Sequence, residues 1–303
     1  MTSPLPLVTV VIPTHDRREL LRVAVRSVLS QDYAGRIEIL VVHDRSELDH
    51  SIEGWAVAGR SIRVLANGRR PGLAGARNTG ILAAAGSLVA FLDDDDMWLP
   101  DHLERLHLSL SRDDADLAVA WTAADDPTFV FARMTSGLRV PDVVSRNPGF
   151  VGSNFLVRTD TFRAVRGFDP ALRVSNDQDL LVRLLRCGAR YCVVPRVTVR
   201  NRIHTGGQLT DKTERRAQGV LAYRRKHRDL LGLRDQVVLG TILAGIRRVS
   251  APRAVDRVLW TAATAAGRAA LLVSRPRRAS GRRPVPPPLR PAPTSTDVLA
   301  GVA

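Results

Sequence analysis

Residues 87–100, Ser-Leu-Val-Ala-Phe-Leu-Asp-Asp-Asp-Asp-Met-Trp-Leu-Pro, join an apolar segment directly to four carboxylates. Residues 87–92 have the length and composition of a buried strand in an α/β sheet. The acids then lie at the carboxyl end of that strand, where open α/β sheets bind ligands. Adjacent carboxylates repel one another, and their oxygens suit Mg²⁺ or Mn²⁺ held together with substrate phosphates. A solvated acidic loop is the alternative, which the adjoining strand and the following Trp98-Leu99-Pro100 disfavour.

Strand-like and helix-like segments alternate before and after this stretch. Residues 7–12 and 37–42 predict buried strands, 62–65 a shorter strand, and 73–85 a helix. This alternation implies an α/β fold with a mainly parallel sheet flanked by helices and right-handed crossovers. The later segments predict a helix at 177–187 and strands at 117–121, 128–131, 190–194 and 197–203.

The net charge of +15 belongs almost entirely to the C-terminal third of the 303 residues. Residues 212–303 contain 19 Lys and Arg against 5 Asp and Glu, whereas residues 1–211 contain 26 and 25. We therefore expect a catalytic domain over 1–211 and a basic helical extension over 212–274. Residues 275–303 are rich in Pro and Arg and are expected to be disordered.

The sequence predicts a cytoplasmic protein. The N-terminus lacks the pattern of a secretory signal, and no stretch of 18 apolar residues predicts a membrane span. Cys187 and Cys192 have no metal-binding spacing and are expected to be core thiols. The apolar, Arg-studded stretches 236–249 and 255–273 suit the inner, anionic face of a membrane. The alternative is that these helices pack on the catalytic domain.

Other classes of phosphate-binding protein do not fit. There is no P-loop, and Gly72 to Gly80 lacks the dinucleotide-binding spacing. A nucleotidyltransferase, the nearest alternative function, should carry a Gly-rich basic loop after the first strand, where this chain has Pro13-Thr14-His15-Asp16. A nucleic-acid-binding role is not expected, because the positive charge avoids the acidic site and the tail has no interleaved aromatic residues.

The chain resembles the family 2 glycosyltransferases, which have the GT-A fold. The resemblance covers about residues 7–210 and rests on seven segments in order, which are residues 10–17, 27–31, 39–44, 75–80, 93–96, 176–180 and 202–204. It implies that a nucleotide-diphosphate-sugar donor transfers its sugar, with inversion, to a hydroxyl acceptor. That acceptor would be a glycan, a lipid-linked molecule or a small molecule.

The resemblance also implies roles for individual residues. On the donor side it places Pro13, Thr14, Arg17, Asp44, Arg77, Asp93 and Asp94. The Mg²⁺ or Mn²⁺ ligands it implies are Asp93, Asp95 and His204, although a lone histidine is more often structural. Residues His43 and Arg45 depart from the family pattern around Asp44, so the nucleotide base stays open.

On the acceptor side, the resemblance implies that Asp177 is the general base. The family usually has Glu before this Asp, whereas this chain has Asn176, and a helix cap is the alternative role for Asp177. Gly152, Ser153 and Asn154 are expected to line the acceptor side, with a plain turn as the alternative.

Overall fold

The computed structural model describes residues 4–126, 128–202 and 212–273. Its strands are β1 Val8–Thr14, β2 Ile37–His43, β3 Arg60–Ala66, β4 Leu88–Phe91, β5 Asp96–Trp98, β6 Leu117–Ala124, β7 Phe155–Arg158 and β8 Tyr191–Asn201. The α-helices are α1 Arg18–Leu29, α2 Leu73–Ala83, α3 His102–Arg112, α4 Val140–Val143, α5 Thr159–Ala164, α6 Asn176–Arg186, α7 Glu214–Lys226, α8 Leu233–Ser250 and α9 Ala254–Val273. Two short 3₁₀ helices are η1 His50–Trp55 and η2 Gly152–Asn154.

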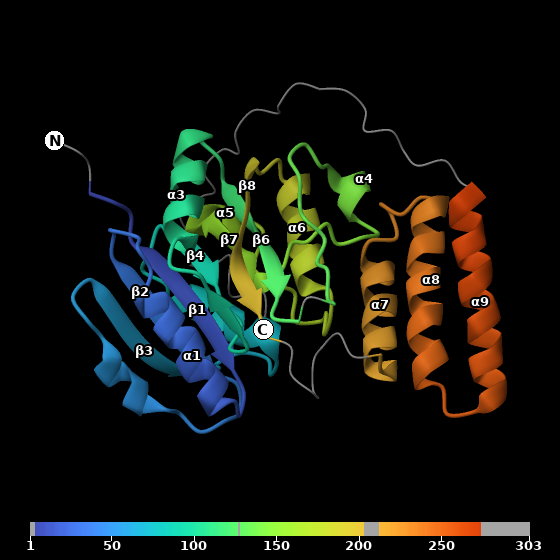
Figure 1. Cartoon of the computed structure of the whole chain (residues 1–303), viewed down its shortest axis with the longest axis horizontal. Helices are drawn as coiled ribbons and strands as arrows, with labels where there is room; N and C mark the ends of the chain where they lie inside the picture. Colours follow the sequence, from blue (N-terminus) through green and yellow to red (C-terminus); the bar gives the residue numbers. More distant parts are fainter. Residues whose placement is uncertain (1–3, 127, 203–211, 274–303) are drawn as a thin grey trace.

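The strands form one mixed sheet in the order β3-β2-β1-β4-β7-β6-β8-β5. The four strands β3, β2, β1 and β4 run parallel, as the alternation predicted. β7 then runs antiparallel to both β4 and β6, which makes the sheet mixed. The α/β fold is confirmed, and the carboxyl ends of β1, β2 and β4 meet at one edge (Figure 1).

Both faces of the sheet are covered, which explains why β1 and β2 are buried along their whole length. Leu21 of α1 and Leu106 of α3 pack with Val10 in one core cluster. Ile81 of α2 and Leu181 of α6 pack in a second cluster, with Val11. The near-continuous apolar runs of these strands are what a parallel sheet between two helical layers requires.

Three expectations from the sequence are wrong. Residues 128–131 form no strand, because an Asx turn in which Thr128 N donates to Asp126 Oδ1 at 2.8 Å starts a loop. The two strands expected over 190–203 are one strand, β8, whose register against β6 is irregular around Trp121. Cys187 is exposed at the end of α6, whereas Cys192 is buried as expected.

The C-terminal helices α7, α8 and α9 lie side by side at one end of the molecule (Figure 1). Several hydrogen bonds join them to the α/β part. Tyr223 Oη donates to Val144 O at 2.9 Å, and Ser145 Oγ donates to Asp235 Oδ1 at 2.8 Å. Helix α9 packs along α8, where Gly267 lies against Thr241. None of the helices described is long and apolar enough to cross a membrane.

Candidate active site

Asp93, Asp94 and Asp95 lie in the connection between β4 and β5, and Asp96 is the first residue of β5. Two residues at the end of β8 hold the backbone of this acidic turn and the side chain of its last aspartate. Arg202 donates to Asp95 O and to Asp94 O, each at 3.0 Å. Asn201 Nδ2 donates to Asp96 Oδ1 at 2.7 Å. The acidic segment is therefore a fixed turn, and the alternative of a freely solvated loop is not supported.

The side chains of Asp94 and Asp95 point toward the end of β1. Thr14 Oγ1 donates to Asp94 Oδ2 at 2.7 Å. Arg17 Nη1 donates to Asp95 Oδ2 at 2.7 Å and to Asp94 Oδ1 at 3.2 Å. These contacts bring together the residues that the resemblance assigned to the donor side of the first and fourth strands.

Arg77 joins the acidic turn to the proposed base. It reaches from α2 and is completely buried. Its Nη2 donates to Asp93 Oδ1 at 2.6 Å, and its Nη1 donates to Asp177 Oδ1 at 2.8 Å. The guanidinium also lies 4.7 Å from the ring centroid of Phe168. The two carboxylates raise the pKa of Arg77, although burial alone would lower it.

The acidic turn carries more negative charge than its arginines balance. Burial raises the pKa of Asp93 to about 6, assisted by the charges of Asp95 and Asp177, although Arg77 opposes the shift. Burial, followed by the charges of Asp93 and Asp95, raises the pKa of Asp96 well above its usual range. Such shifts mark carboxylates that are poorly compensated when ionised.

Asp177 lies in the first turn of α6. Its carboxylate accepts from Arg77, and no hydrogen bond from a backbone N–H of α6 to it is present in the described part of the chain. A purely capping role is therefore not supported. Ser175, directly before the helix, has φ +60°, a left-handed conformation that is strained for serine and is often found at functional sites. The side chain of Asn176 donates to Leu172 O at 2.9 Å.

Asp44 directly follows β2. Its carboxylate accepts from Asn67 Nδ2 at 2.8 Å and from the Gly72 backbone N–H at 2.9 Å. Burial would raise the pKa of Asp44, but these hydrogen bonds and the neighbouring Arg45 hold it below its usual value. Asp44 is therefore a preformed anion at the edge where a nucleotide base is expected.

The loop that contains Gly152, Ser153 and Asn154 does not lie where the sequence predicts, at the acceptor side of the cavity. Ser153 and Asn154 are fully buried, and none of Gly152, Ser153 and Asn154 lines the cavity. Ser153 Oγ accepts from Asp93 N at 3.0 Å and donates to Asp96 Oδ2 at 2.5 Å. A Cβ on Gly152 would lie 1.9 Å from Arg77 Nη2. This loop therefore supports the acidic turn and Arg77, and a direct contact with the acceptor is not available to these side chains.

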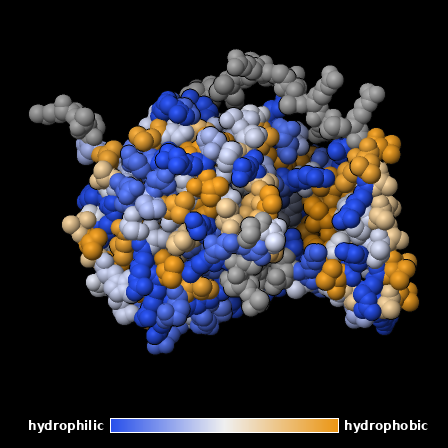
Figure 2. All heavy atoms as spheres, viewed as in Figure 1, coloured by the Kyte–Doolittle hydropathy of each residue, from blue (hydrophilic) through white to orange (hydrophobic). Residues whose placement is uncertain are grey.

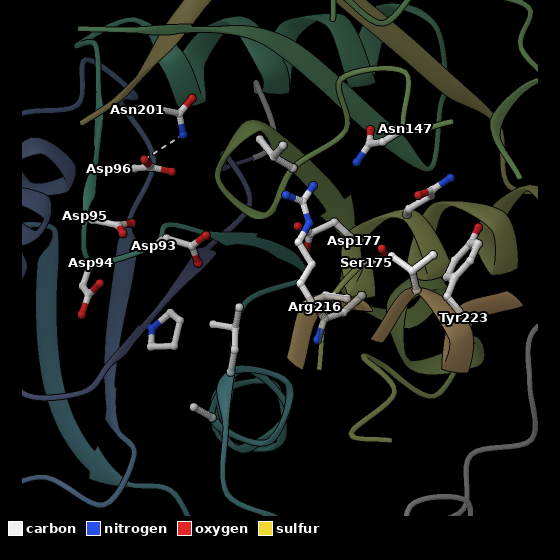
Figure 3. A pocket seen from close by; sticks show the side chains of 18 of the residues that line it. Asp93, Asp94, Asp95, Asp96, Asn147, Ser175, Asp177, Asn201, Arg216 and Tyr223 are labelled. Carbon is white, nitrogen blue, oxygen red and sulfur yellow. Dashed lines mark hydrogen bonds between the residues drawn. The ribbon is translucent and has the colours of Figure 1, made fainter. Parts of the chain in front are cut away.

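A single cavity of about 660 Å³ connects the acids to Asp177. Pro13, Thr14, Arg17 and Asp44 line it beside the acidic turn. Figure 3 shows Asp93 and Asp95 on one side of the cavity and Tyr223 on the other, with Asp177 and Arg216 between them. Arg77 contributes nothing to the lining, because its guanidinium lies beneath the surface.

The donor set fits a metal that is shared with a substrate. Asp93 and Asp95 supply hard oxygen ligands at the strand end, beside the charge imbalance described above. His204 lies outside the described residues, and those residues contain no group of three His, Cys, Asp or Glu able to hold a metal alone. Mg²⁺ is usually held by one or two carboxylates plus substrate phosphates, which this arrangement matches.

Some structural roles had no local signal in the sequence. Arg202 and Asn201 act on the acidic turn from more than a hundred residues away. The α7 and α8 residues that line the cavity, Val220, Tyr223, Leu239 and Ile242, follow no recognisable motif. The sequence of 236–249 predicts a membrane-surface helix or, as the alternative, one packed on the catalytic domain, and it does not indicate which side chains line the cavity.

Sequence relatives match more than half of this chain. ExoO, a succinoglycan biosynthesis protein of Rhizobium meliloti, is 33% identical over 212 residues, which are 63% of this chain and 59% of ExoO. The chain therefore spans less than two thirds of that relative. WcaA of Escherichia coli, a putative colanic acid biosynthesis glycosyl transferase, is 24% identical over 235 residues, covering 74% of this chain and 82% of WcaA.

Solved structures share the fold at low sequence identity. S. aureus TarS 1–349 in complex with UDP-GlcNAc has a TM-score of 0.63 at 16% identity, over 87% of this chain and 81% of TarS 1–349. The mannosyltransferase PcManGT from Pyrobaculum calidifontis, in complex with GDP-Man and Mn²⁺, has a TM-score of 0.60 at 18% identity, over 89% and 84%. Residues 9–167, more than half of the chain, match Glycosyl transferase family 2. The chain belongs to glycosyl transferase family 2 and has the GT-A fold.

Proposed function

We propose that this protein is a metal-dependent, inverting glycosyltransferase. It would transfer a sugar from a nucleotide-diphosphate donor to an acceptor hydroxyl group. The observation that carries the proposal is Arg77, which ties the acidic turn to Asp177 on the two sides of one cavity. A donor and an acceptor bound in that cavity would meet between these carboxylates.

The donor side would use residues at three strand ends. Asp44 would accept a hydrogen bond from the nucleotide base, and Asp93 would lie toward the ribose. Asp93 and Asp95 would hold Mg²⁺ or Mn²⁺ together with the diphosphate, and His204 is a further candidate ligand. Such a cation supplies neutralisation of the charge that develops on the leaving diphosphate.

Asp177 would act on the acceptor. Its carboxylate would take the proton of the acceptor hydroxyl as that oxygen attacks the anomeric carbon from the face opposite the diphosphate. Attack from that face inverts the configuration. The ion pair with Arg77 fixes one oxygen of Asp177, so the side chain is held in place before the acceptor arrives.

Release of nucleoside diphosphate tests this function. The full chain would be incubated separately with UDP-, GDP- and dTDP-sugars, with Mg²⁺ or Mn²⁺ and with EDTA. We expect release from at least one donor, and its loss in EDTA. Release that is insensitive to EDTA would contradict the metal-dependent mechanism, and no release from any donor, with or without acceptor glycosides, would contradict the function. Once an acceptor is found, the anomeric configuration of the product decides between inversion and retention.

We further propose that α9 contacts an anionic membrane surface. Val258 and Leu259 are 68% and 62% exposed on α9, beside the exposed Arg257. An apolar helix face bordered by arginine suits the boundary between water and lipid headgroups. The relative WfgD of Escherichia coli is named as acting on a diphosphoundecaprenol-linked acceptor, which supports a lipid surface as partner. A cytoplasmic location at the inner membrane face remains a prediction.

Sedimentation with anionic vesicles tests the membrane contact. The full chain should co-sediment with phosphatidylglycerol-containing vesicles at low salt, and Val258→Asp/Leu259→Asp should reduce the bound fraction severalfold. Leu108→Asp on α3, where the side chain is 57% exposed, is the matched control and should leave binding unchanged. Equal binding by the α9 variant, or no binding by the wild type, would contradict the contact.

A further inference from the structure

The cavity extends well past the residues that the proposed reaction requires. It begins at the strand-end acids, passes Asp177 and Ser175, and ends against helices α7 and α8. Figure 3 shows Tyr223 on the far side of Asp177 from the acidic turn. The donor belongs with the acids, so the far end is the space from which an acceptor hydroxyl would approach Asp177.

The far end differs chemically from the donor end. Val220 of α7 and Leu239 and Ile242 of α8 line it, and Phe131 and Val174 face the same cavity. The Tyr223 hydroxyl is already used by Val144 O at 2.9 Å, so this residue presents ring carbons. Figure 2 shows hydrophobic side chains bordering the recess between the α/β part and the C-terminal helices. A sugar alone has no apolar group to match such a wall.

The wall is fixed to the catalytic helix by specific contacts. A Cβ on Gly219 of α7 would lie 2.2 Å from Val174 Cγ2, so the glycine permits close approach to the segment before Asp177. Leu172, Tyr223 and Leu239 form one buried cluster across the junction. His227 Nε2 lies 2.9 Å from Asp179 Oδ1 on α6. The apolar wall therefore has a defined position relative to the proposed base.

Two arginines also line the cavity, Arg216 of α7 and Arg146 of the loop after α4. Arg146 is exposed and forms no ion pair within the described ranges 4–126, 128–202 and 212–273. An acidic group attached near an apolar chain would find a cation here, whereas the donor diphosphate is expected at the opposite end.

We propose that the α7–α8 wall binds the apolar chain of an amphiphilic acceptor, while the sugar part of that acceptor presents its hydroxyl group to Asp177. This inference rests on the proposed glycosyltransferase function and narrows its acceptor class. Contact with Val220, Leu239 and Ile242 removes part of the chain from water, which stabilises binding in proportion to the apolar area buried. A purely hydrophilic glycan would leave this wall unused.

Acceptor glycosides that differ only in the length of their alkyl chain test the proposal. Methyl and octyl glycosides of the common hexoses and N-acetylhexosamines would be compared below their micellar concentrations, with the donor that supports metal-dependent nucleotide release. We expect kcat/KM for an octyl glycoside to exceed that for its methyl partner by about tenfold or more, roughly the effect of burying two methylene groups. Most of the difference should appear in KM.

Two variants on α8 locate the effect. Ile242 is 37% exposed and lines the cavity, whereas Val249 is 53% exposed on the same helix and does not. Ile242→Gln should reduce the octyl-to-methyl ratio at least about threefold, and Val249→Gln should leave it unchanged. Equal kcat/KM for methyl and octyl partners, or equal ratios in both variants, would overturn the proposal.

Photo-labelling tests binding without turnover. An alkyl glycoside with a diazirine at the end of its chain should label residues 217–245, and excess octyl glycoside should compete, whereas methyl glycoside should not. Labelling elsewhere only, including on α9 alone, would overturn the assignment of the wall. Metal-dependent nucleotide release does not depend on the alkyl chain of the acceptor. Absence of that release would therefore reject the proposed function, whereas absence of the preference for octyl glycosides alone would reject only this inference.

Discussion

The two ends of the cavity are built in different ways. At the donor end, the carboxylates that follow β4 are held by Thr14 and Arg17, and Asp44, which follows β2, is held by Asn67 and the Gly72 N–H. At the far end, apolar side chains of α7 and α8 form the wall, held by contacts with segments that precede α6. The difference suggests that the donor end determines the chemistry common to the family, while the far end determines which acceptor is used.

The largest effect is expected at Asp177, where the two ends meet. Asp177→Asn preserves the size of the side chain and removes its basicity, so transfer should fall about 10²–10⁴-fold. Donor binding should change little, because the donor end is intact. Steady-state kinetics together with calorimetric donor binding separate these effects, and an unchanged kcat would remove Asp177 as the base.

Asp95→Ala should impair the function of the donor end and leave the far end of the cavity unchanged. Loss of a group that stabilises developing charge lowers the rate by about 10²–10³-fold. The loss should appear in nucleotide release both with and without an acceptor, whereas a far-end variant such as Ile242→Gln affects only the reaction with an amphiphilic acceptor. Asp113→Ala, at the exposed end of α3, is the control. Wild-type, metal-dependent turnover in Asp95→Ala would contradict the assignment.

Gly152→Ala tests whether Arg77 positions the two carboxylates. The new Cβ would clash with Arg77 Nη2, and a displacement of about 1 Å at a reacting centre lowers rates by up to about 10²-fold. We expect kcat to fall about tenfold to a hundredfold, with a smaller change in KM. Gly240→Ala on α8 meets nothing within 4 Å and serves as the control. If Gly152→Ala keeps the wild-type kcat, Arg77 has no such role.

Asp179→Asn tests the contacts that join α6 to the end of α7. Burial would raise the pKa of Asp179, but the His227 hydrogen bond and the charges of Arg183 and Lys226 lower it to about 2. A lowered acid pKa stabilises the fold above the unfolded pKa near 4, and this stability is lost as pH falls toward 2. We expect Asp179→Asn to destabilise the protein by roughly 2 kcal/mol at neutral pH.

Urea unfolding at several pH values measures this effect. The difference between wild type and Asp179→Asn should shrink as pH falls from about 4 toward 2. Asp160→Asn, at a carboxylate that is 99% exposed, should show no comparable difference. A difference that is constant with pH would mean that the ion pairs of Asp179 contribute little.

The difference between the two ends of the cavity also explains which features the sequence could predict. The strand-end acids, Asp44 and the alternating elements lie in short segments, so local patterns and the family resemblance place them at one sheet edge. The acceptor side was not predictable in this way. Ser153 and Asn154 have the polarity of contact residues, yet burial makes them supports for the acidic turn. Ile242 reaches the cavity only because tertiary contacts dock α8 against α7 and the loop after α4.

Binding of nucleoside diphosphate with and without metal tests the central claim most directly, that Asp93 and Asp95 hold a cation jointly with the diphosphate. Calorimetric titration of UDP, GDP and dTDP needs neither the sugar nor the acceptor to be known. We expect Mn²⁺ to tighten binding of the preferred nucleotide about tenfold or more in the wild type, a change of about 1.4 kcal/mol, and to have little effect in Asp95→Ala. Equal affinity with Mn²⁺ and with EDTA in the wild type would contradict the account.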